Sequence, residues 1–405
     1  MVQNFAHAWH PMVTRMEPVP GPNGAQQRRF WVLGGDRPYL EQLTYLSHSD
    51  RIMEYTALEG IEGARRYQAR LQVQGHEIVW SAQIEAAPQR AIEIAESTRA
   101  IFRAGLDALA NPEPAPQTSP DLPEPVAVQS LRLDGDPPLA ISVAPAGQAQ
   151  TKTLCVFLHG IGGQRGNWQA QMRAMGTIMP CVALDLRGYG KSALGVGQSR
   201  VDDYCDDILR VAEYFQAQEI VLCGLSYGAW IATSFAMRHG RRLAGLVLAG
   251  GCTGMSEASS EARAAFRHSR EVPLDAGQSP ADFAADVVQV IAGPDAPDAV
   301  RAELRESMAA ISSKTYRDAL NCFTNPPETF DFARISVPVL LMTGAHDRLA
   351  SPQEIRQVSV RMHAAAQDPD IRFEVVPDAG HVCNLEQPGA FNAHLAAFLH
   401  RFPHE

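Results

Sequence analysis

The sequence predicts an α/β fold: a mostly parallel eight-stranded sheet with a helical cap, preceded by a smaller α+β module. Three observations support this prediction. After residue 126, short apolar runs alternate with helical stretches, which is typical of a parallel sheet. A proline-rich segment, residues 111–125, separates this part from a strand-rich beginning. A Gly-x-Ser-x-Gly pentapeptide, residues 224–228, stands between an apolar run and a helical stretch.

Composition bounds the class of protein. The chain has 405 residues, too long for one typical core, and its 45% apolar and 20% charged residues are ordinary for a soluble globular protein. A net charge of −10 and the lack of a basic run argue against a nucleic-acid partner. Apolar runs of roughly eighteen residues, which a membrane span needs, do not occur, and the first residues lack a signal-peptide pattern. The seven cysteines are scattered without a CxxC pair, so we expect no zinc site, no disulfide and a reducing, cytoplasmic location.

The first module, residues 1–110, reads as an antiparallel meander followed by one helix. Five strand candidates are separated by Gly, Asp or Pro: residues 24–35, 37–50, 51–60, 65–75 and 76–86. Apolar residues at helical spacing then predict a helix over residues 87–110. A curved sheet that grips a helix encloses an apolar cavity. Seven aromatic and histidine side chains are candidates to line it, and about half of them are expected to belong to the core instead: Trp9, His10, Trp31, Tyr45, Tyr55, Tyr67 and Trp80.

The linker, residues 111–125, leads to the second module, residues 126–405. Its strand candidates are residues 126–133, 139–144, 153–158, 181–186, 219–224, 243–250, 337–344 and 371–377. Helices are predicted between them over residues 166–176, 201–217, 227–240, 351–366 and 388–402. From about residue 253 to 334 only helical stretches occur, and they include residues 259–272, 280–293 and 298–311. Because this insertion lies between two strands, we expect it to form a cap.

Ser226 is the candidate nucleophile. It occupies the centre of the pentapeptide, directly after an apolar strand candidate and before a helix, which is the context of a nucleophile elbow. Such a sharp turn lifts the hydroxyl out of the sheet, and the flanking Gly224 and Gly228 supply the space that it needs. The helix that follows directs its N–H groups at the site.

A serine hydroxyl needs a base and an orienting acid. His381 follows the last strand candidate, in the loop DAGHVCNLEQP, and Asp347 follows the previous one, in TGAHDRLASP. The chain order Ser226, Asp347, His381 is the order of an α/β-hydrolase triad. The carboxyl ends of parallel strands meet at one edge of a sheet, so we expect these three side chains to lie together.

The oxyanion formed during acyl transfer needs two donors. We predict the N–H groups of Tyr227, next to the nucleophile, and Ile161, in the loop HGIGG after residues 153–158. Gly160 and Trp168, in and after the same loop, are candidates for lining the substrate pocket, although Trp168 has an equal claim to core packing.

Other reactive residue types near these motifs have plainer interpretations. Glu257 is an alternative acid, but the context of Asp347 is better. We expect structural roles or exposure, and no chemistry, for the remaining residues: His159, Asp185, Arg187, His346, Cys223 and Cys383.

Five motifs in order resemble the signatures of the α/β-hydrolase superfamily: LHGIGGQRGNW, LDLRGYGKS, CGLSYGAW, GAHDRLASP and DAGHVCNLEQP. The resemblance covers Val126 to Phe402 and is closest to enol-lactonase-like and carboxylesterase-like members with a small helical cap. The first module resembles the helix-grip superfamily of START-like and polyketide-cyclase-like domains, carried by FAHAWHP, GAQQRRFWVLGG, LTYLSHSDRIMEY and VWSAQIEA. Members begin with a strand before the segment that matches AWHP, so the resemblance implies a module that lacks its first strand.

These observations predict a serine hydrolase that cleaves a small ester or lactone through an acyl-enzyme, with no cofactor and no metal. The partner we expect is a small-molecule substrate, with an aromatic one among the candidates, and neither nucleic acid nor a membrane. A homodimer in which a second copy supplies the missing strand is also open. Two other functions remain as alternatives: hydrolysis of a carbon–carbon bond in an aromatic ring-cleavage product, and non-catalytic ligand binding or sensing. A serine in the elbow argues against dehalogenase and epoxide hydrolase chemistry, because these use a carboxylate there.

Overall fold

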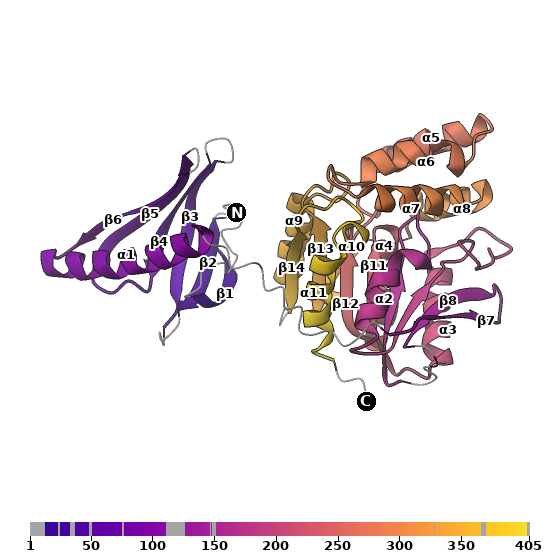
Figure 1. Ribbon diagram of the computed structural model, residues 1–405, viewed down its shortest axis with the longest axis horizontal. Coiled ribbons are helices and arrows are strands. Elements are labelled where there is room, and N and C mark those ends of the chain that lie inside the picture. The colour runs from indigo at the N-terminus through magenta and orange to yellow at the C-terminus, as the bar shows by residue number, and fades with distance from the viewer. Residues whose placement is uncertain are drawn as a thin grey trace. The chain divides into compact units, whose positions relative to one another are not determined.

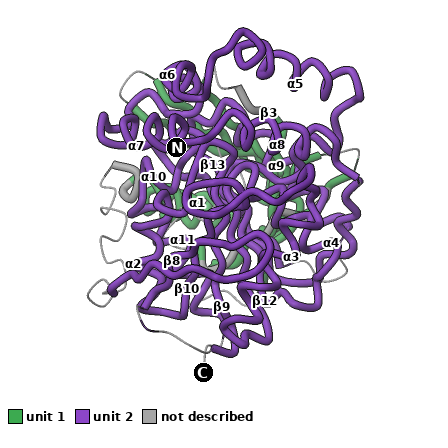
Figure 2. Tube along the Cα trace, turned by 90° about the vertical axis from the view of Figure 1, so that its right-hand side faces the viewer, with its two compact units in different colours: residues 1–118 green, residues 119–405 purple. Residues whose placement is uncertain are grey.

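A computed structural model describes residues 13–22, 25–32, 37–47, 51–74, 77–110, 126–145, 147, 151–327, 329–365 and 370–402. The chain divides into two compact units, residues 1–118 and residues 119–405, which Figure 2 distinguishes by colour. The predicted linker, residues 111–125, lies outside the described residues, as do Trp9 and His10.

The first unit is an antiparallel meander with one helix, as the sequence predicts (Figure 1). Its strands pair in chain order: β1 (Val13–Pro20), β2 (Gln26–Val32), β3 (Tyr39–Ser47), β4 (Ile52–Glu59), β5 (Ala64–Gln74) and β6 (Glu77–Ala86). Helix α1 (Pro88–Ala110) packs on the sheet through Ile94 and Phe102, which join a buried cluster with Met53, Tyr55 and Leu71.

Strand β1 is absent from the predicted elements. Two prolines, Pro18 and Pro20, conceal it, since proline cannot donate to a strand ladder. The sheet order shows why it forms nevertheless: among the described strands β1 pairs with β2 alone and is an edge strand, where proline is tolerated.

The second unit is built on the predicted eight-stranded sheet. The order is β14-β13-β12-β11-β9-β10-β8-β7, parallel from β10 to β14, with β8 antiparallel to both β10 and β7. The strands are β7 (Gln129–Leu133), β8 (Leu139–Ala144), β9 (Thr153–Leu158), β10 (Cys181–Leu184), β11 (Glu219–Leu225), β12 (Leu243–Ala249), β13 (Val339–Gly344) and β14 (Ile371–Val376). Every residue of β8, β9, β10 and β13 is buried, which explains why these strands read as continuous apolar runs.

Helices cover both faces of this sheet. Alternate residues of β9 face opposite sides: Cys155 and Phe157 pack with α2 (Gln169–Met175) and α11 (Pro388–Leu399), preceded by the short α10 (Cys383–Glu386). Leu154, Val156 and Leu158 pack with α3 (Val201–Tyr214), α4 (Tyr227–His239) and α9 (Pro352–Ala365). Burial on both faces fixes the register of the strands.

The predicted cap lies between β12 and β13. It consists of α5 (Ser260–Asp275), α6 (Pro280–Ile291), α7 (Asp298–Ala309) and α8 (Ser313–Thr324), drawn in orange in Figure 1. Serines begin three of these helices, and the Ser259 and Ser312 side chains each accept a backbone N–H three residues on. Among the described residues, no helix is both long and apolar enough to cross a membrane.

Candidate active site

Ser226 lies at the sharp turn between β11 and α4. Its backbone has φ 55° and ψ −113°, a conformation that costs a residue with a Cβ of order 1–3 kcal/mol. The glycines give the turn its space: a Cβ on Gly224 would lie 2.2 Å from the Gly228 oxygen, and one on Gly228 would lie 2.3 Å from the Leu158 oxygen. The Ser226 N–H donates to the Ala249 oxygen at 2.8 Å, which ties the turn to β12. The turn therefore holds Ser226, half-buried, at the carboxyl edge of the sheet.

Asp347 and His381 are buried and hydrogen-bonded to each other. Nδ1 of His381 lies 2.9 Å from Oδ2 of Asp347, and because a carboxylate accepts, Nδ1 carries the proton. Oδ1 of Asp347 accepts from the N–H groups of Leu349 and Ala350 at 2.8 and 2.9 Å. The Thr343 hydroxyl donates to the Ala350 oxygen at 2.7 Å, and its oxygen lies 3.2 Å from Oδ2 of Asp347. The carboxylate is thus fixed, and Nε2 of His381 is the ring nitrogen left for the cavity that this residue lines.

These contacts set the pKa of Asp347. Burial is the largest influence and raises the pKa of the carboxyl group. The hydrogen bond and charge of His381, with the N–H groups of Ala350 and Leu349, act in the opposite direction and together outweigh it. The pKa of Asp347 therefore lies below its ordinary value, and the group is an anion at neutral pH.

The loop that carries His381 is fastened to the cap. The His381 N–H donates to the Ile291 oxygen at the end of α6 at 2.8 Å. Oε2 of the buried Glu386 accepts from the N–H groups of Gly380 and Gly293 at 2.9 and 2.8 Å. Glu386 belongs to the quoted DAGHVCNLEQP motif, but nothing in the sequence indicates that its carboxylate joins two distant backbone segments.

The predicted oxyanion donors lie beside Ser226. Tyr227 is the first residue of α4, where an N–H has no acceptor within the helix. Gly160 approaches the nucleophile closely: a Cβ on it would lie 3.4 Å from the Ser226 Cβ. This approach brings the loop with Ile161 against the turn, and Ile161 and Tyr227 line one cavity. The Tyr227 ring itself is buried, with its centroid 5.4 Å from that of Trp230, so only its backbone is available to chemistry.

A cavity of about 350 Å³ brings the predicted residues together. Ser226, His381, Ile161, Tyr227 and Gly160 all line it. The cap contributes much of its wall, which is largely apolar: Phe266, Val287, Leu304, Met308, Tyr316 and Phe323. Two charged side chains join them, Arg270 from α5 and Glu354 from α9.

Trp168 has both of the roles that the sequence left open, pocket lining and core packing. It lines the cavity, yet it is fully buried, with its ring centroid 5.0 Å from Phe157 and 5.9 Å from Phe391. Its side chain is therefore part of a fixed wall.

The residues expected to be structural have well-defined partners. His159 accepts the Leu186 N–H on Nε2 at 3.1 Å, which places its proton on Nδ1, 2.8 Å from the Gly160 oxygen. Burial lowers the pKa of His159, so the ring is neutral and holds the loop HGIGG in place. Asp185 accepts hydrogen bonds from the N–H groups of Arg165 and Lys191 at 2.8 and 3.0 Å and so fixes the loop LDLRGYGKS.

Arg187 and the two cysteines are likewise buried structural residues. Arg187 donates to Asp207 at 2.9 Å and anchors its loop to α3. Cys223 and Cys383 are fully buried, and burial raises the pKa of both thiols, which makes them poor nucleophiles at neutral pH.

His346 and Glu257 lie outside the lining of the cavity that contains Ser226 and His381. His346 is exposed. Glu257 accepts from Arg361 at 2.9 Å near the surface, so Asp347 alone of the two candidate acids contacts His381. Among the described residues, no group of His, Cys, Asp and Glu is arranged to hold a metal ion.

Comparison with known proteins agrees with this architecture. Residues 155–394 match the sequence pattern of the alpha/beta hydrolase family. The chain belongs to this family. Residues 2–111 match a second pattern, described as polyketide cyclase / dehydrase and lipid transport, which bears out the predicted helix-grip module.

Individual members of the alpha/beta hydrolase family are distant. A 3-oxoadipate enol-lactonase of Acinetobacter baylyi is 25% identical over 65% of this chain and 94% of its own length. A 2-succinyl-6-hydroxy-2,4-cyclohexadiene-1-carboxylate synthase of Serratia proteamaculans is 28% identical over 64% of this chain and 98% of its own. A thermophilic esterase of Thermogutta terrifontis has the same fold, with a TM-score of 0.58, 23% identity, and coverage of 67% of this chain and 98% of its own.

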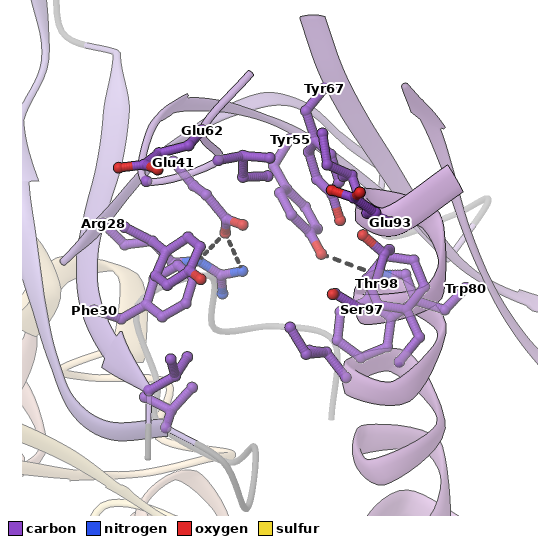
Figure 3. A pocket seen from close by; sticks show the side chains of 18 of the residues that line it. Arg28, Phe30, Glu41, Tyr55, Glu62, Tyr67, Trp80, Glu93, Ser97 and Thr98 are labelled. Atoms are coloured by element: carbon purple, nitrogen blue, oxygen red, sulfur yellow. Dashed lines mark hydrogen bonds and ion pairs between the residues drawn. The ribbon is translucent and has the colours of Figure 1, made fainter. Parts of the chain in front are cut away.

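The helix-grip unit contains its own cavity of about 180 Å³ between the sheet and α1 (Figure 3). Tyr55, Tyr67 and Trp80 line it, as the sequence predicts, whereas Trp31 and Tyr45 are not among its lining residues. Its polar groups are joined to one another. Trp80 donates to the Tyr55 hydroxyl at 2.9 Å, and the buried Arg28 donates from Nε to Glu41 at 2.7 Å.

Proposed function

We propose that the chain is a serine hydrolase acting on a small carboxylic ester or lactone. One observation carries the proposal: a buried Asp347–His381 pair and a serine at a strained strand-to-helix turn line the same cavity. Relatives named as a lactonase and an esterase support this substrate class. The name of another relative, a synthase, shows that family membership by itself does not decide the reaction.

The proposed mechanism assigns one step to each group. Nε2 of His381 removes the proton from the Ser226 hydroxyl as its oxygen attacks the carbonyl carbon. Asp347 holds the ring and stabilises the imidazolium that forms. The N–H groups of Ile161 and Tyr227 stabilise the oxyanion, and each such donor contributes about 2.7–4 kcal/mol in enzymes of this kind.

Collapse of the tetrahedral intermediate completes acylation. The carbonyl–oxygen bond to the leaving group breaks, and His381 returns its proton to the leaving oxygen. Water, activated by the same nitrogen, then attacks the acyl-enzyme and releases the acid with Ser226 restored. In a lactone the leaving oxygen stays attached to the acyl group, so only one product forms.

Ser226→Ala tests the proposal against a panel of 4-nitrophenyl esters and lactones. We expect kcat to fall by about 10⁵- to 10⁶-fold, because the variant has no hydroxyl to attack the carbonyl. Cys223→Ala is the matched control: it removes a buried side chain from β11 that does not line the cavity, and it should retain most of the wild-type kcat. A Ser226→Ala variant as active as the wild type contradicts the mechanism.

We propose ligand binding as a second function, located in the helix-grip unit. The observation in its favour is the cavity lined by aromatic rings, where Trp80 stacks on Phe102 at 4.2 Å. A flat apolar molecule matches such walls. Ser97 lines this cavity from α1 (Figure 3), so Ser97→Trp should block it and weaken the binding of 2-naphthol at least about tenfold.

Glu96→Trp is the control for this experiment. Glu96 is exposed and adjacent to Ser97 in the chain, but it does not line the cavity. Calorimetric titration of the full chain provides the measurement. Equal affinity in the wild type and the Ser97→Trp variant would place 2-naphthol elsewhere and contradict this second function.

A further inference from the structure

Arg270 is a charged side chain in an otherwise largely apolar wall. It lies on the cap helix α5 and lines the same cavity as Ser226. The guanidinium carbon lies over the Phe266 ring, also in the wall, 3.5 Å from its centroid. Packing on this ring holds the guanidinium in a defined position.

The partners of Arg270 are neutral. Nη1 donates to the Phe266 oxygen at 3.2 Å and to the Ser269 hydroxyl at 3.0 Å. In the part of the chain that the structure describes, no carboxylate forms an ion pair with it. The acidic residues later in the same helix are paired elsewhere: Glu271 with Arg267 at 3.8 Å, and Asp275 with Arg317 at 2.6 Å.

A partly buried cation without a counterion is an unfavourable element of a fold. Burial lowers the pKa of Arg270, and among the described residues Tyr316 opposes this shift. Proteins generally pair a buried charge with an opposite charge, and an anionic group of a bound ligand would supply that charge for Arg270. The planar guanidinium, with Nε and Nη2 free of described partners, matches the two oxygens of a carboxylate.

The other charged residue of the wall restricts where an anion could bind. Glu354 lies on α9, and burial, followed by the charges of Asp347 and Glu257, raises its pKa. The carboxyl groups of Glu354, Asp347 and Glu257 make the α9 side of the cavity the acidic one, and Arg270 supplies positive charge from α5. A negatively charged part of a substrate is repelled from the α9 side of the cavity and attracted to Arg270 on the α5 side.

We propose that Arg270 binds a carboxylate of the substrate, so that the natural ester or lactone carries a free carboxylate apart from the bond that is cleaved. The inference rests on the proposed hydrolase function of this cavity. Arg270 acts in it as a specificity-determining residue, and takes no part in proton transfer.

Two pairs of esters test the inference. Mono-4-nitrophenyl glutarate and 4-nitrophenyl pentanoate differ by a carboxylate in the acyl part; 3-acetoxybenzoate and phenyl acetate differ by one in the alcohol part. We expect the wild type to favour the charged member of at least one pair in kcat/KM by about 10- to 100-fold. Arg270→Met should remove this preference, because it should lower kcat/KM for the charged ester much more than for the uncharged ester.

Arg270→Lys separates charge from packing, because it keeps a cation but cannot form the two parallel hydrogen bonds. It should recover part of the preference. Calorimetric titration with glutarate and 3-hydroxybenzoate gives a readout that does not depend on turnover, and Arg270→Met should weaken the better ligand by a similar factor.

The outcomes distinguish the two proposals. Equal hydrolysis of charged and uncharged esters by the wild type, or a preference that Arg270→Met leaves intact, overturns the role of Arg270 and leaves the hydrolase function standing. Hydrolysis of none of the four esters counts against the hydrolase function, and the titrations then decide about Arg270: binding lost in Arg270→Met supports its role, whereas binding unchanged or absent overturns it.

Discussion

The helix-grip cavity and the hydrolase cavity each contain an arginine packed on an aromatic ring, but the two arginines differ in their partners. Arg28 lies 5.0 Å from the Tyr55 ring and donates to the carboxylate of Glu41, and both side chains of this pair are 8% exposed. Arg270 lies 3.5 Å from the Phe266 ring, with neutral acceptors only among the described residues. A charge neutralised by the fold is part of the wall, whereas one left open is suited to a ligand.

The same contrast separates the polar groups of the candidate active site. Asp347 accepts hydrogen bonds from His381, Leu349 and Ala350, and it does not line the cavity. By contrast, the Tyr227 N–H can still donate a hydrogen bond, and Nε2 of His381 can still accept one.

The largest expected effect concerns Asp347. Asp347→Asn keeps the shape of the side chain but favours the wrong tautomer of His381, so kcat should fall by about 10⁴-fold, as such a change does in serine hydrolases. Glu257→Gln, at the alternative acid, should leave kcat near the wild-type value because Glu257 pairs with Arg361 near the surface. Steady-state kinetics on one ester measures both, and comparable losses would mean that the acid has been misassigned.

The next effect is on stability. Arg28→Met leaves Glu41 buried without its counterion and should lower the free energy of unfolding of the first unit by about 3–5 kcal/mol at pH 7. Arg70→Met removes an ion pair to Glu54 that is 45% and 36% exposed, so its cost should stay below about 1 kcal/mol. Guanidinium denaturation compares the two, and equal losses would show that Arg28 has no special structural role.

The loss in Arg28→Met should also depend on pH. Burial raises the pKa of Glu41 and Arg28 opposes this, so removing Arg28 raises the pKa further. A carboxyl group with a raised pKa in the folded state stabilises fully below its unfolded pKa, and this stability is lost as the pH rises through the folded pKa. The deficit of Arg28→Met should therefore be larger at pH 8 than at pH 5, and a deficit that shrinks with rising pH would contradict the ion-pair account.

Asp347 should show the opposite dependence, with a smaller amplitude. Its pKa is depressed in the folded protein, so its stabilising contribution is present above the unfolded pKa of about 3.9 and disappears as the pH falls through the folded value. The wild type should be more stable than Asp347→Asn at pH 6 and should lose this advantage below about pH 4. Unfolding curves at several pH values measure the difference.

The smallest effect is expected at Arg270. Arg270→Met removes no ion pair, so the free energy of unfolding should change by less than about 0.5 kcal/mol or should increase. Arg301→Met is the matched control from the same cap, because Arg301 donates to the backbone oxygens of Ala296, Gly293 and Pro294 and should cost about 1–3 kcal/mol. A loss at Arg270 as large as that at Arg301 would make Arg270 a structural residue.

Sequence alone predicts the parts of this molecule that local pattern controls. Buried strands read as apolar runs, and loops after their carboxyl ends carry Ser226, Asp347 and His381, so the grouping of these residues at one edge of the sheet follows from topology. Their assignment as a triad remains a prediction. Edge strand β1 is missed because its prolines disguise a strand that needs only one partner.

The cap shows where prediction from one sequence stops. Which face of α5 lines the cavity depends on how four helices pack, and helical spacing gives no indication that Arg270 faces inward while Arg267 pairs with Glu271. Glu386 is a similar case, since its role depends on Gly293 and Gly380 meeting in the fold. The lining of the cavity by the cap therefore depends on tertiary contacts, whereas the predicted triad residues stand in local motifs.

Covalent labelling with diisopropyl fluorophosphate, located by peptide mass spectrometry, tests the central claim most directly. An activated serine displaces the fluoride, so we predict one phosphoryl adduct per chain on the peptide that contains Ser226, and none in Ser226→Ala. The same reagent should react far more slowly with His381→Ala, because that variant lacks the base. An unlabelled wild type, or an adduct on any other residue, would contradict the assignment of Ser226 as the nucleophile.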